Sequence, residues 1–255
     1  MAILTAEIFS QCLNRNTQIR VIIPADDLNG FRSGPFKTLY LLHGVYGTYN
    51  DWINRTGILG IAEKNSLAVV MPDGANDFYV DNPKAAKNYG EYIGRELIQI
   101  TRGLFPLSDN REDTFIGGLS MGGYGALRAG LKYSDTFSKI IALSTAVINQ
   151  NGRVEDDSFP FFPMRKGFLD SVFGDFSTIG DTGNDLITLI ESQANIKNKP
   201  SIYFSCGRQD DFYNDNVKFY KLANELGFDC TADWREGYHE WGFWNSVIGD
   251  AVKWL

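Results

Sequence analysis

Short apolar runs rich in β-branched residues alternate with longer stretches of helical period along most of the chain. We expect strands at residues 7–10, 17–24, 37–42, 67–72, 114–118, 139–143, 201–206 and 230–236. We expect helices near residues 52–65, 89–105, 121–132, 185–195, 216–226 and 241–255. Because parallel strands can be joined only by a long crossover, usually a helix, this alternation indicates a mostly parallel sheet flanked by helices. The sequence therefore predicts an α/β fold, with the first two strands as an antiparallel edge hairpin.

The length and hydrophobic content of the chain suit one domain. With 255 residues, of which 44% are hydrophobic, the chain can bury a sizeable core, so we expect residues 1–255 to form a single domain. Residues 145–181 break the alternation, because they are dense in Phe, Pro and Gly and have no clean period. A long irregular stretch inside a compact domain is usually functional or mobile. We interpret residues 145–181 as a cap or lid over the sheet edge, with an ordinary packed loop as the alternative.

Charge and cysteine usage exclude several classes of partner. The chain carries 24 basic and 31 acidic residues, a net charge of −7, and has no basic run, so we expect no nucleic-acid partner. Its apolar stretches fall far short of the roughly 20 residues that span a bilayer, and no signal-like segment opens the sequence, so we expect a cytoplasmic protein without membrane contact. The three cysteines are widely spaced, and we expect no disulfide framework, metal or cofactor. A homo-oligomer is left open.

One serine lies in a glycine-rich segment, GGLSMGGYG at residues 117–125. The pentapeptide around Ser120 has the form G-x-S-x-G, follows an expected strand and precedes an expected helix. In that position it predicts a nucleophile elbow, a sharp strand-to-helix turn in which flanking glycines avoid the clashes that side chains would cause. The serine hydroxyl is thereby exposed for attack on a substrate.

A serine nucleophile needs a base, and the chain has only two histidines, His43 and His239. In α/β-hydrolases the catalytic residues follow the order serine, acid, histidine, which selects His239 as the base. His43 follows an early strand, where we expect it to fix the turn by hydrogen bonding. The Val45 amide in that turn, and the Met121 amide after the nucleophile, are the expected donors of an oxyanion hole.

The acid is expected after a strand between Ser120 and His239. Asp210 and Asp211 both follow the apolar strand in SIYFSCGRQDDFYNDN, and spacing alone does not choose between them. Either aspartate could instead serve as a turn residue or a helix cap. The acid would orient the imidazole and stabilise its charged form.

Several segments together resemble the tributyrin-esterase group of the putative-esterase, or esterase D-like, branch of α/β-hydrolases. They are YLLHGVYGTYNDW, VVMPDG, FYVD, TFIGGLSMGGYGALR, SVFGDF, CGRQDDFYNDN and GYHEWGFW. The resemblance implies the α/β-hydrolase fold and a triad of Ser120, Asp210 and His239. Relatives more often carry an apolar residue where this chain has Asp211. In this family the segment that corresponds to residues 145–181 often completes the substrate pocket.

These residues together predict a serine carboxylesterase that hydrolyses short-chain acyl esters through an acyl-enzyme. The resemblance implies that these substrates include acetyl or feruloyl esters of sugars. The partner of the enzyme would be a small-molecule ester. The alternatives are an acyltransferase or a thioesterase similar to S-formylglutathione hydrolase on the same scaffold, or a non-catalytic binding protein. Four side chains are candidates for substrate contact, namely His43, Tyr79, Phe161 and Trp244. Aromatic residues such as these are also common in ordinary cores.

Overall fold

The computed structural model describes residues 1–27, 30–152 and 154–255. Within these ranges the main sheet has eight strands in the order β1-β2-β6-β5-β9-β10-β11-β12. The bounds are β1 (Ala2–Ser10), β2 (Arg15–Ile23), β5 (Thr38–Leu42), β6 (Ala68–Pro72), β9 (Thr114–Leu119), β10 (Lys139–Leu143), β11 (Ser201–Ser205) and β12 (Cys230–Asp233). The β1–β2 and β2–β6 pairs are antiparallel and the remaining pairs are parallel. The predicted α/β fold and its antiparallel edge hairpin are confirmed.

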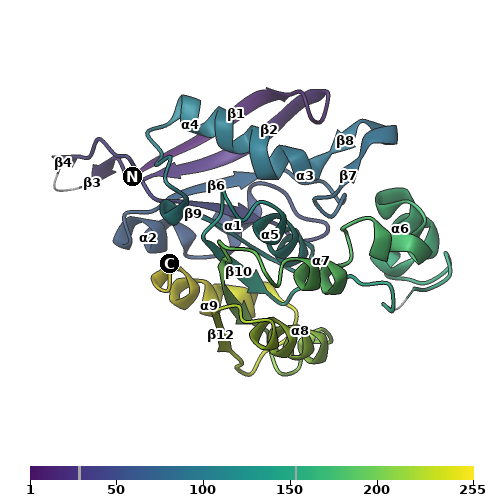
Figure 1. The fold of residues 1–255 in the computed structure, drawn as a ribbon. Coiled ribbons are helices and arrows are strands. Elements are labelled where there is room, and N and C mark those ends of the chain that lie inside the picture. Colours follow the sequence, from purple (N-terminus) through teal and green to yellow (C-terminus); the bar gives the residue numbers. More distant parts are fainter. Residues whose placement is uncertain (28–29, 153) are drawn as a thin grey trace.

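Helices cover both faces of the sheet (Figure 1). Their bounds are α1 (Asp51–Arg55), α2 (Ile58–Lys64), α3 (Tyr89–Glu91), α4 (Leu97–Leu104), α5 (Met121–Lys132), α6 (Lys166–Phe173), α7 (Leu186–Ser192), α8 (Tyr213–Glu225) and α9 (Trp241–Lys253). Because successive side chains of a strand point to opposite faces, β5 sends Leu39 and Leu41 into one core and Tyr40 and Leu42 into the other. The first core lies under α1, α2 and α9, and the second lies under α3, α4, α5, α7 and α8.

Two predicted helices differ from the structure in their continuity. The helix expected at 52–65 is two helices, α1 and α2, because Thr56 takes an extended backbone and its hydroxyl bonds back to the Trp52 carbonyl at 2.5 Å. The helix expected at 89–105 contains a π-helical turn, η2 (Tyr92–Glu96), between α3 and α4. In that turn Gly94 packs so closely on Tyr133 that a Cβ would lie 2.1 Å from the ring.

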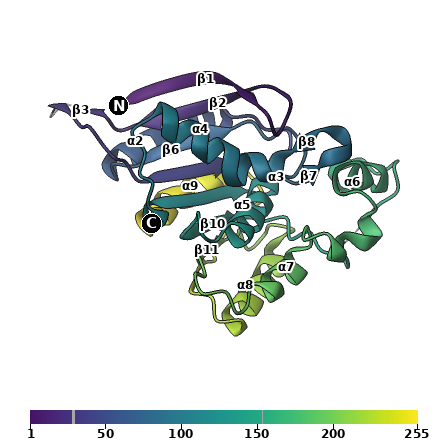
Figure 2. The same ribbon diagram turned by 45° about the horizontal axis from the view of Figure 1, so that its top comes forward.

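Residues 145–181 contain regular structure that the sequence pattern did not indicate. The segment forms the short helices η4 (Phe162–Met164) and η5 (Phe176–Asp181) around α6, and Arg153 in it lies outside the described residues. Figures 1 and 2 show α6 at the side of the molecule, projecting from the helical layer. Its aromatic side chains contact Phe78, with ring centroids at 6.3 Å for Phe168 and 5.4 Å for Phe173.

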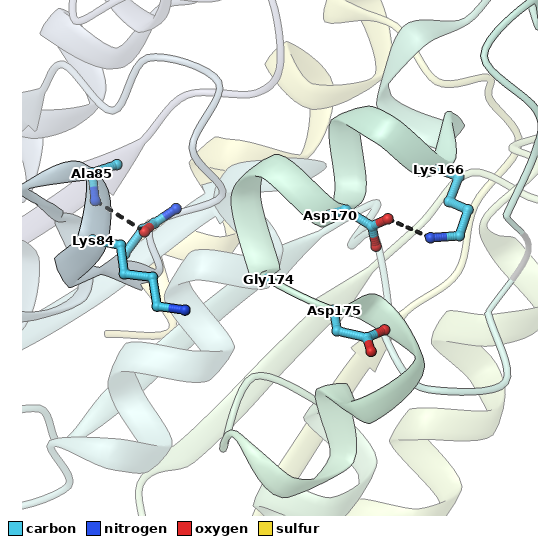
Figure 3. A pocket seen from close by; sticks show the side chains of 7 residues that line it. Lys84, Ala85, Lys166, Asp170, Gly174 and Asp175 are labelled. Carbon is cyan, nitrogen blue, oxygen red and sulfur yellow. Dashed lines mark hydrogen bonds and ion pairs between the residues drawn. The ribbon is translucent and has the colours of Figure 1, made fainter.

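A cleft of about 600 Å³ lies between α6 and the short hairpin of β7 (Asp81–Asn82) and β8 (Lys87–Asn88). Figure 3 shows its charged lining, with Lys166 paired to Asp170 and with Lys84 on the facing turn. None of the serine, aspartate and histidine residues of the predicted triad lines it. In the part of the chain that the structure describes, no helix is long and apolar enough to cross a bilayer.

Candidate active site

Ser120 lies between β9, which ends at Leu119, and α5, which begins at Met121. Its backbone has φ 54° and ψ −117°, a strained conformation for a residue with a side chain. The tightness of this turn requires glycine on either side. A Cβ on Gly118 would lie 2.4 Å from the Gly122 carbonyl oxygen, and a Cβ on Gly122 would lie 2.5 Å from that of Leu42. The strand-to-helix turn expected from the sequence is therefore present.

Ser120, His239 and Asp210 form a continuous chain of hydrogen bonds. The Ser120 Oγ lies 3.0 Å from His239 Nε2, and His239 Nδ1 lies 2.9 Å from Asp210 Oδ2. The other carboxylate oxygen of Asp210 accepts a bond of 2.9 Å from the Phe212 amide. The Asp210 side chain has no exposed surface, whereas Asp211 is exposed. The structure thus brings Asp210, and not Asp211, to the histidine.

The environment of Asp210 favours its charged form. Burial opposes ionisation of the carboxyl group, but hydrogen bonding and attraction from His239, with the Phe212 amide, outweigh it and lower the pKa of Asp210. The imidazole of His239 packs nearly perpendicular to the rings of Phe212 and Trp244, each with its ring centroid 5.0 Å away. Trp244 is itself fixed, because its indole N–H donates to the buried Ser144 hydroxyl at 3.1 Å. The acid and the imidazole are therefore both firmly placed.

The loop after β5 carries His43 and Val45 beside the elbow. His43 Nδ1 donates to the Gly44 carbonyl at 2.8 Å, so its Nε2 must be the acceptor for the Gly74 amide at 2.9 Å. Burial lowers the pKa of His43, which agrees with this neutral form. The Tyr79 hydroxyl donates to the His43 carbonyl at 3.0 Å. These contacts anchor the loop, as we expected of His43.

The two amides expected to form an oxyanion hole follow neighbouring strands, because Val45 lies in the loop after β5 and Met121 begins α5 after β9, and β5 pairs with β9. Within residues 1–27, 30–152 and 154–255, neither the Val45 nor the Met121 amide donates a hydrogen bond to another protein group. The next amide of the loop, that of Tyr46, is held by the Asn76 side chain at 3.0 Å. Tyr46 has a positive φ of 65°, which turns the loop back at this point.

A cavity of about 430 Å³ opens at Ser120 and His239. It is also lined by Gly44, Val45, Tyr46, Gly47, Asp51, Arg55, Leu119, Phe161, Glu240, Trp241 and Trp244. Of the four side chains predicted to contact substrate, Phe161 and Trp244 line the cavity. His43 and Tyr79 do not, because each is 1% exposed and lies beneath the loop it supports. Substrate contact by these two side chains is a prediction that the geometry contradicts.

Several lining residues were missed from the sequence, among them Tyr46, Arg55 and Trp241. Trp241 lies in the segment GYHEWGFW, two residues after the predicted base, and that short separation was the available signal. Arg55 lies over the Trp241 ring, with its guanidinium carbon 5.7 Å from the centroid. It comes from α1, almost 190 residues from Trp241, and no local pattern links the two. In the described part of the chain, no group of three or more His, Cys, Asp or Glu side chains is placed to hold a metal ion.

The structure has the features of α/β-hydrolase-type enzymes. These are a mostly parallel sheet, helices on both of its faces, and a serine on a strained turn after a central strand. Residues 10–255 match the family described as putative esterase. The chain therefore belongs to the putative esterase family and is a serine hydrolase acting on ester bonds. The family resemblance and the enzyme class expected from the sequence are confirmed.

Similar proteins are esterases and serine hydrolases. An acetyl esterase from Caldicellulosiruptor saccharolyticus is 38% identical over 261 residues, covering 100% of this chain and 98% of that protein. The structure of an S-formylglutathione hydrolase from Staphylococcus aureus aligns with a TM-score of 0.85 and 28% identity, covering 99% of this chain and 98% of that chain. A fluorophosphonate-binding serine hydrolase from Staphylococcus aureus aligns with a TM-score of 0.84 and 27% identity, covering 99% and 97%.

Proposed function

We propose that this chain is a serine carboxylesterase of short-chain acyl esters, with Ser120 as nucleophile, His239 as base and Asp210 as the acid. The observation that carries the proposal is the hydrogen-bond chain of 2.9 and 3.0 Å that ends on Ser120 at an open cavity. A serine hydroxyl is a weak nucleophile until an adjacent base takes its proton. The arrangement of these three side chains supplies that base and fixes its tautomer.

The reaction follows from this arrangement in two steps. His239 Nε2 takes the proton of Ser120 as its Oγ attacks the ester carbonyl, and the same imidazole then protonates the departing alcohol. The resulting acyl-enzyme is hydrolysed when a water molecule gives a proton to His239 and attacks the acyl carbon. The bond from that carbon to the Ser120 Oγ then breaks, the Oγ takes the proton back from His239, and the carboxylic acid is released. The Val45 and Met121 amides stabilise the oxyanion in both tetrahedral intermediates, and removal of one such donor can cost about 3 kcal/mol.

The size of the cavity supports a small ester as substrate. Its volume of about 430 Å³ lies at the lower end of the range for small-molecule sites. The 38% identical relative is described as an acetyl esterase, which supports acetyl esters, including those of sugars, as substrates. Residues 145–181 supply Phe161 to the cavity wall, so we propose that they form the cap of a single domain comprising residues 1–255.

Thioester hydrolysis is the second candidate function. It is favoured by the similarity to a structure described as an S-formylglutathione hydrolase, at 28% identity over 99% of this chain. A formyl thioester would form the same acyl-enzyme on Ser120, and only its leaving group would differ. Transfer of the acyl group to another alcohol would follow if that alcohol replaced water in the second step.

The deciding experiment measures turnover of p-nitrophenyl esters of increasing acyl length, acetylated and feruloylated sugars, and S-formylglutathione. We expect the highest kcat/KM on acetyl or other short-chain oxygen esters. The Ser120→Ala variant should lose turnover of every substrate, and a fluorophosphonate probe should label the wild type and not this variant. Turnover that persists in Ser120→Ala would contradict the proposed nucleophile. A strong preference for the thioester would select the second candidate.

A further inference from the structure

The acid and the base lie on two loops that the sheet alone does not hold together. Asp210 follows β11 and His239 follows β12, and these parallel strands pair only as far as Ser205 and Asp233. Beyond that point four residues precede Asp210 in one loop and five precede His239 in the other. Some other contact must therefore fix the position of one loop against the other.

Backbone hydrogen bonds continue between the loops. The Arg208 amide donates to the Arg235 carbonyl at 2.9 Å, and the Gln209 amide donates to the Gly237 carbonyl at 3.1 Å. The backbones approach so closely that a Cβ on Gly207 would lie 2.1 Å from the Gly237 carbonyl oxygen. A Cβ on Gly237 would in turn lie 2.4 Å from the Phe243 ring. The histidine loop is therefore packed between the acid loop and α9.

The Gln209 side chain completes this contact. Its Oε1 accepts from the Gly237 amide at 2.7 Å, while its own backbone amide donates to the Gly237 carbonyl. Gln209 and Gly237 thus exchange two hydrogen bonds, as two residues of a β-ladder do, with the side-chain oxygen replacing a backbone carbonyl. The Nε2 of Gln209 donates to the carboxylate of Glu236, which also lies 3.7 Å from the Arg208 Nε.

We propose that Gln209 is a positioning residue that holds the imidazole of His239 in line between Asp210 and Ser120. It immediately precedes the acid in the sequence, and Gly237 lies two residues before the base. Neither Gln209 nor Glu236 lines the cavity, so the effect on the reaction passes through the two loops. This inference depends on the proposed function, because it assigns a role relative to that triad.

Loss of this contact should lower kcat more than it changes KM. A displacement of about 1 Å at a reacting group can lower the rate about 100-fold, and neither Gln209 nor Gly237 lines the cavity. For Gln209→Leu we expect kcat to fall about 10- to 100-fold, with KM within about twofold of the wild type. Gln209→Asn keeps the amide on a shorter side chain, and it should lose kcat as well because it cannot reach both partners.

Charge provides the sharper test. Gln209→Glu keeps an oxygen for the Gly237 amide but sets a second carboxylate against Glu236, so we expect a similar loss of kcat. The double variant Gln209→Glu with Glu236→Gln restores one amide and one carboxylate with their roles exchanged, and kcat should return to within about threefold of the wild type. Gln18→Glu is the matched control, because it places a new carboxylate opposite Glu7 on the exposed β1–β2 hairpin and should leave kcat unchanged.

The measurements are kcat and KM on p-nitrophenyl acetate, with thermal unfolding of each variant to confirm that it folds. If Gln209→Leu unfolds, Gln209→Asn decides the question. Wild-type kcat in the folded Gln209 variants, or a loss in Gln209→Glu that Glu236→Gln does not restore, would overturn the positioning role. Either of these two results would overturn only the role of Gln209 and not the proposed triad. Failure of the proposed function itself would instead be seen as retained turnover in Ser120→Ala.

Discussion

The strained backbone at Ser120 predicts an unusual order of stability for two inactive variants. Ser120→Ala and Ser120→Gly both remove the hydroxyl and its contact with His239, and they differ only in the Cβ. A residue with a Cβ at φ 54° and ψ −117° carries about 1–3 kcal/mol of backbone strain, which glycine does not. The greater freedom of glycine in the unfolded chain offsets about 0.4–1 kcal/mol of this gain. We therefore expect Ser120→Gly to be more stable than Ser120→Ala by about 1 kcal/mol.

The two variants can be compared by urea unfolding and by thermal melting. A difference of about 1 kcal/mol corresponds to about 2–4 °C in Tm for a chain of about this length. The control is Gly60 in the exposed part of α2, where a Cβ meets no atom within 4 Å and φ is not positive. There Gly60→Ala should stabilise the protein, the opposite of the order expected at Ser120. An equal or lower stability of Ser120→Gly would refute the inference of stored strain at the elbow.

Three further predictions follow from the site. Asp210→Asn should lower kcat about 10³- to 10⁴-fold, whereas Asp211→Asn should stay within about twofold, and equal losses in a steady-state assay would contradict the choice of acid. His43 has a lowered pKa, so below the unfolded-state value of about 6.5 the unfolded chain binds more protons and stability falls as the pH falls, by at most about 1.4 kcal/mol per pH unit. Equilibrium unfolding between pH 7 and 5 should show a smaller slope in His43→Gln, and an unchanged slope would argue against a neutral buried His43. Phe161→Ala should raise KM several-fold for acyl chains longer than acetyl and leave acetyl esters nearly unchanged, and a uniform loss of kcat across chain lengths would argue against wall contact.

Helices and strands whose apolar residues recur with a clear period could be predicted from the sequence, but interruptions within these elements could not. The bounds expected for α5 and β10 match the structure, because the elbow marks the start of α5 and a β-branched run marks β10. The π-helical turn at η2 leaves the apolar stripe almost unchanged, so the sequence reads as one helix there. Helix α6 was missed because the Phe, Pro and Gly around it obscure its period, and it is held by ring contacts with Phe78 from a distant loop.

The candidate site was predictable where order along the chain carries information. Strand, turn and helix in sequence select Ser120, and the order of the triad selects His239. Spacing does not choose between the two adjacent aspartates, and in the sequence only the family resemblance indicates Asp210. In the structure Asp210 is 5% exposed and contacts His239, whereas Asp211 is exposed. The residues next to a loop side chain in the sequence likewise do not show in which direction it points. The supporting role of His43 was expected from its place after an early strand, but Tyr79 could not be recognised from the sequence as a support beneath the cavity wall.

The order of the strands explains why the histidine loop needs a support of its own. The loop that carries Val45 follows β5, which pairs directly with β9, the strand that precedes Ser120, so the order of the strands places Val45 near Ser120. His239 follows β12, three strands from β9, and adjacent strands lie about 4.8 Å apart, so its loop must return across roughly 14 Å to reach Ser120. The acid loop after β11 lies along that path and offers the nearest fixed surface. Gln209 contacts Gly237 at that point, and in the proposed positioning role this contact holds the histidine loop so that His239 stays 3.0 Å from Ser120.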